Sequence, residues 1–172
     1  MSTYHAWYLS LGGFLMVASP GSAHAQKDVP VKMVYAVWHD TTGAQNAVKH
    51  MSKGAKDQIE AYAVVIKDKA GKVEPRLRHH KAGSAKGLQA TETIDSAIVR
   101  LSIPADSVSG YVAGGQTTTR LSEDDLKKVV RMFGPGESAL LLISPNSAVS
   151  EIKKTLGMGA EGHPEIIELE VK

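Results

Sequence analysis

The chain has 172 residues, of which 42% are hydrophobic and 22% are charged, and its formal net charge is +2. This length suits one domain, and the composition excludes both a disordered tail and a bundle of membrane-spanning helices. The absence of cysteine excludes disulfides, thiolate metal ligands and a cysteine nucleophile. Lys and Arg are scattered, with the longest basic cluster at residues 76–81, so nucleic-acid binding is not expected.

The first 25 residues have the features of a secretory signal. Residues 9–18 form an apolar run that is about half as long as a bilayer-spanning helix. A Pro-Gly pair ends this run, and the triplet Ala23-His24-Ala25 carries the small residues that suit signal peptidase. We therefore expect cleavage after Ala25 and a periplasmic or secreted protein. Residues 1–8 contain no Lys or Arg, unlike a normal signal, so retention as an N-terminal anchor is the alternative.

The predicted domain, residues 26–172, begins with a strand, a helix and a second strand. Residues 31–38 and 59–67 are rich in β-branched and aromatic side chains, which favour strands. Between them, apolar residues at helical spacing predict a helix that is capped by Asp40 or Thr41 and runs to about Lys53, where Gly54 fits its end.

A hairpin and a loop-rich insert follow. Residues 68–71 form a tight turn, and residues 72–78 return as a third strand, in which Pro75 indicates a sheet edge or a bulge. The insert covers about residues 81–120 and is rich in Gly, Ser and Lys at its start. Within it, residues 94–101 fit either a short helix or a strand, because their apolar pattern satisfies both periods.

The last third contains two helices and two strands. Ser122 and the acidic residues after it predict the start of a helix that ends at Gly134-Pro135-Gly136. Residues 138–144 hold a continuous apolar run, which is typical of a strand buried on both faces.

Asn146 or Ser147 then caps a further helix, which Gly157 ends. Residues 165–172 alternate between apolar and acidic side chains, as in a strand with one buried face.

This order, β-α-β-β-(insert)-α-β-α-β, predicts an α/β (α+β) fold. Two β-α-β crossovers and one hairpin favour a mixed sheet with helices on at least one face. A ferredoxin-like plait, or an elaboration of one, is the first expectation, and a flavodoxin-like arrangement is the alternative.

Two stretches of this sequence resemble a bacterial family. The first is IEAYAVVIKDKAGKV (residues 59–73), and the second is GPGESALLLI (residues 134–143) with the closing helix and strand. In this order they are similar to domain-of-unknown-function family 1269, a group of predicted membrane proteins. In that family a VVV-K-D-x-x-G-K-V hairpin follows a β-α unit, and a P-x-G-S-S-A-L strand precedes the last α-β unit. The resemblance implies a fold but no activity.

The chain departs from this family between the two stretches. The family has a long hydrophobic Gly/Ala-rich hairpin there, whereas residues 91–120 of this chain include Asp95, Arg100, Asp106 and Arg120. Charged side chains are costly in a bilayer. We therefore expect no membrane span in the mature chain.

Histidines are the best candidates for chemistry. His39 and Asp40 follow the first strand, at the kind of position where α/β sheets commonly bind ligands, and His79 and His80 end the third strand. Imidazole is a common transition-metal ligand, so either pair predicts a metal or small-molecule site. In a plait the first and third strands are antiparallel, which separates the two pairs by about 20 Å. The simpler interpretation is that they are surface histidines.

Other catalytic motifs are missing from the sequence. The glycine-rich stretches 83–87 and 110–115 lack the Lys-Ser/Thr ending of a phosphate-binding loop. No Gly-x-Ser-x-Gly elbow surrounds a serine. The sequence therefore predicts no cofactor, and Trp38 and Tyr62 are expected to pack in the core.

Together these features predict an exported, non-enzymatic binding or accessory domain of the cell envelope. Its partner would be another protein, or a second copy bound through an open sheet edge. A periplasmic metal or small-molecule binding protein that uses His39/Asp40 or His79/His80 is one alternative. A hydrolase with an unrecognised site is the other.

Overall fold

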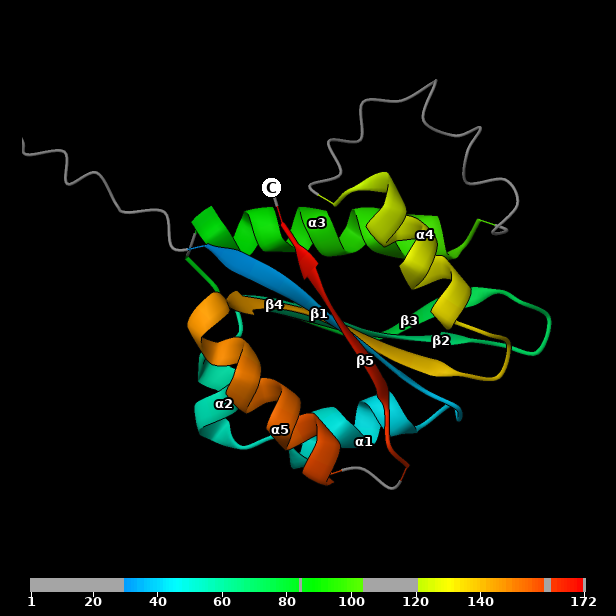
Figure 1. Ribbon diagram of the computed structural model, residues 1–172, viewed down its shortest axis with the longest axis horizontal. Coiled ribbons are helices and arrows are strands. Elements are labelled where there is room, and N and C mark those ends of the chain that lie inside the picture. Colours follow the sequence, from blue (N-terminus) through cyan, green and yellow to red (C-terminus); the bar gives the residue numbers. More distant parts are fainter. Residues whose placement is uncertain (1–29, 84, 104–120, 160–161, 172) are drawn as a thin grey trace, which may run out of the picture.

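The structure, a computed structural model, describes residues 30–83, 85–103, 121–159 and 162–171 (Figure 1). The predicted signal and part of the insert lie outside these residues. The strands are β1 (Val31–Trp38), β2 (Ala61–Lys67), β3 (Val73–His80), β4 (Ser138–Pro145) and β5 (Glu165–Glu170). The helices are α1 (Gly43–His50), α2 (Lys53–Asp57), α3 (Ala85–Leu101), α4 (Glu123–Met132) and α5 (Val149–Gly159), with a 3₁₀ turn (Asn146–Ala148) before α5.

All five strands form one sheet in the order β3-β2-β4-β1-β5. The expected α+β class is confirmed, but the expectation of a mixed sheet is wrong, because every neighbouring pair is antiparallel. Each crossover skips a strand: β1 and β2 are parallel with β4 between them, and β4 and β5 are parallel with β1 between them. The same pairing excludes the parallel sheet of the flavodoxin-like alternative.

Helices cover both faces of the sheet (Figure 1). Helices α3 and α4 pack on one face, and α1, α2 and α5 pack on the other. We call these the α3/α4 face and the α1/α5 face. Neither layer contains a helix, within the described residues, that is long and apolar enough to span a membrane.

Strand β4 lies at the centre of the sheet, and its first seven residues are buried. Leu141 and Ile143 point into the core under α3 and α4, whereas Leu140 and Leu142 point into the core under α1 and α5. Burying one such side chain contributes about 1.5–3 kcal/mol. The prediction of a strand buried on both faces is therefore confirmed, and β4 joins the two cores.

The predicted helix over residues 41–53 is divided into two. Helix α1 ends at His50, and Met51 adopts an extended backbone (φ −61°, ψ 130°). Ser52 then starts α2, because its hydroxyl accepts a hydrogen bond from the backbone N–H of Ala55 at 3.2 Å. Gly54 lies inside α2 and does not end a helix.

Residues 94–101 belong to a helix, α3, which starts at Ala85 and so extends into the stretch predicted as loop. Ala90, Ile94, Ala97 and Leu101 recur at helical spacing and pack on the α3/α4 face, and this burial stabilises a helix whose start has a loop-like composition. Helix α5 similarly continues past Gly157 to Gly159.

Gly43 provides a test of the packing between β1 and α1. A Cβ atom at this position would lie within 2.6 Å of the Trp38 Cβ, and the Trp38 ring is buried. We predict that Gly43→Ala lowers the free energy of unfolding by about 1–3 kcal/mol in urea denaturation. Gly157→Ala is the matched control, because that Cβ would meet nothing within 4 Å in α5, and it should leave stability unchanged or slightly raised. Equal stability of the two variants would contradict this packing.

Candidate functional site

The four predicted ligand residues lie at opposite ends of the sheet. Trp38, the residue before His39, pairs with Ser138 at the start of β4. His79 pairs with Tyr62, and Tyr62 pairs with Leu142 further along β4. This register gives an offset of about 13 Å along the strands and about 14 Å across three strand spacings, hence about 20 Å overall. The two histidine pairs therefore do not form one site.

His39 pairs with a carboxylate from the start of β4. Its Nδ1 lies 2.6 Å from Oε1 of Glu137, and the second carboxylate oxygen accepts the backbone N–H of Gly134 at 2.5 Å. The hydrogen bond with Glu137 and the negative charge of Glu137 raise the pKa of His39. Since the imidazole is 73% exposed, its other nitrogen faces water. This pair links the end of β1 to the loop between α4 and β4.

Asp40 is occupied with the backbone of its own loop. Its Oδ1 accepts hydrogen bonds from the backbone N–H groups of Thr42 (2.6 Å) and Gly43 (2.5 Å) and from the Thr42 hydroxyl (3.0 Å). Partial burial raises the pKa of Asp40, but the three hydrogen bonds outweigh it, so the net pKa is lowered. Asp40 therefore stabilises the entry to α1, but the N-cap residue of α1 is Thr42 and not Asp40 or Thr41 as predicted.

The hydroxyl nearest to Glu137 in the chain is not available as a nucleophile. Ser138, the hydroxyl next to Glu137 in the chain, is buried, and its Oγ accepts the backbone N–H of Ala44 at 3.0 Å. Among the described residues, no group of three His, Asp or Glu side chains could hold a metal ion. The His39–Glu137 pair can exchange a proton with solvent, and ligand binding by His39 and Asp40 stays a prediction.

The second histidine pair lies on β3, an edge strand. His79 stacks on Tyr62 of β2, with 5.2 Å between the ring centroids and 29° between the ring planes. Tyr62 is partly buried and packs against the core of the α1/α5 face, so its expected core position is confirmed at the margin of that core. Leu77, two residues before His79 on β3, is 36% exposed. These three side chains form a small apolar area beside the helices of the α1/α5 face.

The pairing of β3 with β2 determines which backbone N–H and C=O groups of β3 point away from the sheet. The N–H of Lys81 donates to the carbonyl of Glu60 at 2.8 Å, so the backbone N–H and C=O of Lys81 point towards β2. Because inward and outward residues alternate in an antiparallel pair, Leu77 and His79 also face β2, whereas Arg78 and His80 direct their backbone N–H and C=O outward. The register between the two strands shifts between Val64 and Val65 of β2, next to Pro75 of β3. The prediction that Pro75 marks a sheet edge or a bulge is therefore confirmed.

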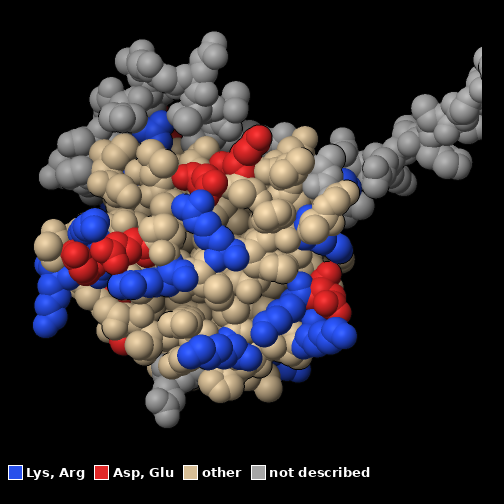
Figure 2. Space-filling model, turned by 180° about the vertical axis from the view of Figure 1, so that it is seen from behind, with Lys and Arg blue, Asp and Glu red and all other residues tan. Residues whose placement is uncertain are grey.

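Cationic side chains surround this edge. Residues 72–81 contain Lys72, Arg76, Arg78 and Lys81 against a single carboxylate, Glu74. Glu74 lies 3.1 Å from Lys72 and 3.0 Å from Arg76, and Arg78 lies 2.9 Å from Asp95 on α3. Figure 2, which views the molecule from behind, shows Lys and Arg side chains, with some Asp and Glu side chains beside them, around an uncharged area.

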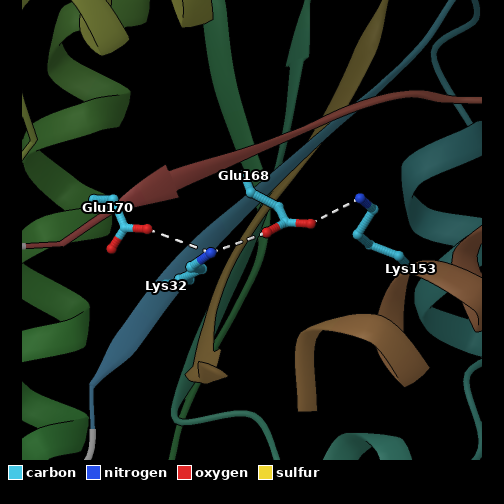
Figure 3. A network of polar contacts seen from close by, with 4 residues as sticks. All are labelled: Lys32, Lys153, Glu168 and Glu170. Atoms are coloured by element: carbon cyan, nitrogen blue, oxygen red, sulfur yellow. Dashed lines mark hydrogen bonds and ion pairs between the residues drawn. The ribbon is translucent and has the colours of Figure 1, made fainter. Parts of the chain in front are cut away.

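The opposite edge of the sheet, β5, carries carboxylates in place of cations. Glu168 lies 3.2 Å from Lys32 and 2.8 Å from Lys153, and Glu170 lies 3.3 Å from Lys32 (Figure 3). The hydrogen bonds from Lys153 and Lys32 lower the pKa of Glu168. An open depression of about 400 Å³ lies beside this network and is lined by Asn146, Val149, Ser150, Lys153 and Glu168. The carboxylates of Glu168 and Glu170 are thus compensated within the molecule.

No family model, curated protein or solved structure matched the chain in three comparisons. The candidate site is therefore inferred from the geometry of the structure alone. Sequence reasoning missed Glu137 as the partner of His39, because the two are 98 residues apart. It also treated Arg76 and Arg78 only as part of a basic cluster, although the edge position of Pro75 was a usable signal.

The pKa of His39 tests its pairing with Glu137. We predict that Glu137→Gln lowers the His39 pKa, measured by NMR titration, whereas Glu151→Gln on α5 leaves it unchanged. Because the folded-state pKa is raised, the stabilising effect is complete below the ordinary imidazole pKa and is lost as the pH rises through the raised value. An unchanged His39 pKa in Glu137→Gln would contradict the pairing.

Proposed function

We propose that the chain is an exported, non-enzymatic protein of the cell envelope that binds another protein through the open edge of its sheet at β3. The observation that carries this proposal is the outward backbone of Arg78 and His80 on an edge strand. The last six residues of β3 are exposed, and none of α1, α2 and α5 packs closely on this strand. An edge of this kind can accept a strand from a partner.

The two edges of the sheet support β3 and not β5 as the binding edge. Glu168 on β5 is held by two lysines of the same molecule, so its charge is already balanced. Residues 72–81 carry four cations, of which Lys72 and Arg76 share Glu74 and Arg78 pairs with Asp95 of α3. The remaining excess of positive charge favours a partner that brings negative charge.

A non-enzymatic role is supported by the arrangement around His39. The nearby Ser138 hydroxyl is buried and bonded to the backbone, and Asp40 is committed to the start of α1. A His–Glu pair alone can move a proton, but hydrolysis by covalent catalysis also needs a nucleophile beside it.

We also propose that strands β5-β1-β4-β2 form a ferredoxin-like plait. Their order and two interleaved crossovers support this assignment, with β3, α3 and α4 added between β2 and β4. In the resemblance to family 1269, the amphipathic α3 would stand in the place of that family's hydrophobic hairpin.

Export is tested by the N-terminus of the protein purified after expression in a bacterium. We predict a mature chain that begins at Gln26, and an Ala25→Arg variant that is not cleaved. His24→Arg is the matched control, because the middle position of the triplet is free to vary, and it should be processed normally. Intact Met1 on the unmodified protein would contradict cleavage and favour the N-terminal anchor.

Edge binding is tested by a photo-reactive benzoylphenylalanine in place of His80, compared with the same group in place of Lys154. Both positions are exposed, but Lys154 lies on α5. In exporting cells, we predict one discrete cross-linked product from the His80 position and none from the Lys154 position. The mass of the product shows whether the partner is another protein or a second copy. Equal products from both positions, or none from either, would contradict binding at β3.

A further inference from the structure

We infer that the partner of β3 is a short, extended and acidic segment of another protein, which adds to the sheet as a sixth strand. This inference rests on the proposed function, since it specifies the chemistry of the partner at the same edge. It follows from three properties of β3: its free backbone groups, its charge and the side chains on its two faces.

The free backbone limits the length of the added strand. Arg78 and His80 each present one outward N–H and one outward C=O, which together offer four hydrogen bonds. Towards the hairpin, Pro75 lacks an N–H and the bulge beside it bends the strand. The part of β3 that can pair with a partner is therefore its C-terminal half, which accommodates about four to six residues of a partner strand.

The charge of the edge selects an acidic segment. The side chains of Arg76 and Arg78 are both about half-exposed, and each forms an ion pair with one carboxylate of this chain. Lys81 follows directly, with its side chain 3.5 Å from the Asp57 carbonyl. A strand that places a carboxylate opposite Arg78 would therefore meet a half-exposed cation, and such a cross-strand pair of opposite charge is favourable.

The two faces of β3 select different side chains. On the α3/α4 face the strand presents Arg78, which lies beside Asp95. On the α1/α5 face it presents Leu77 and the His79 ring stacked on Tyr62. Because side chains alternate along a strand, a partner that alternates acidic and apolar residues places its carboxylates by Arg78 and its apolar side chains by Leu77.

A second copy of the chain fits this edge less well. Pairing β3 with β3 of another molecule would bring Arg76 and Arg78 against like charges, which is destabilising. Pairing β3 with β5 would gain little from Glu168, because Lys32 and Lys153 already balance its charge. The charges thus favour a separate acidic partner.

The test uses the full chain, purified after export, and a capped six-residue peptide that alternates Glu and Val. By calorimetry we expect this peptide to bind at least tenfold more tightly than the matching Lys-Val peptide, and its affinity to fall as salt is added. On binding, hydrogen exchange should slow at the backbone amides of Arg78 and His80.

Three variants locate the binding. We expect Arg76→Glu and His80→Pro to weaken binding of the Glu-Val peptide at least tenfold, the second because proline removes an outward N–H without removing a bond to β2. The matched control Lys154→Glu should change it less than twofold. Thermal unfolding of each variant checks that the fold is kept.

Several results would overturn the inference: equal binding of the two peptides, no effect of Arg76→Glu, or tighter binding of a single-stranded oligonucleotide than of the Glu-Val peptide. A cross-link from His80 without binding of the acidic peptide would refute this partner class and leave edge binding intact. Loss of the His80 cross-link would refute the proposed function itself.

Discussion

The burial of β4 on both faces is the constraint on which the rest of the structure depends. Its apolar run leaves no side that water can reach, so β4 must lie in the middle of the sheet with helices above and below. Each crossover connection then joins two parallel strands that have a third, antiparallel strand between them, so all neighbouring strands of the sheet are antiparallel. The two cores meet through β4, β1 and β2, each of which places buried side chains on both faces of the sheet.

This central position determines which strands are left at the edges. β5 is short, and two of its glutamates, Glu168 and Glu170, are paired with Lys32 and Lys153 of the same molecule. β3 is protected near the hairpin by Pro75 but presents free backbone at Arg78 and His80. Unpaired edges favour aggregation unless charge or proline protects them, and the cations of β3 supply that protection. We propose that the same cations also make the edge selective for an acidic partner.

Much of the fold could be predicted from local patterns. The strands over residues 31–38 and 138–144, the serine cap at Ser122 and the edge position of Pro75 each follow from side chains that are close in sequence. The break between α1 and α2 was missed, because the Ser52 cap competes with an apolar pattern that continues through Met51. The full length of α3 was missed because packing on the sheet outweighs a loop-like composition.

The candidate site was less predictable, because its contacts join distant parts of the chain. The separation of His39 from His79 followed from strand directions alone, whereas the His39–Glu137 pair and the Tyr62–His79 stack depend on the register between strands. Signals for the edge were present in Pro75 and in the basic cluster, but only the strand order shows that, among the described residues, no strand lies on the outer side of β3.

The most direct test of this account is residue-level hydrogen exchange along β3 in the free protein. The account predicts that the outward amides of Arg78 and His80 exchange rapidly, whereas the inward amides of Leu77 and His79 exchange at least about 100-fold more slowly. Equal protection of all four amides would show that the outer edge of β3 is already covered, and would contradict the account.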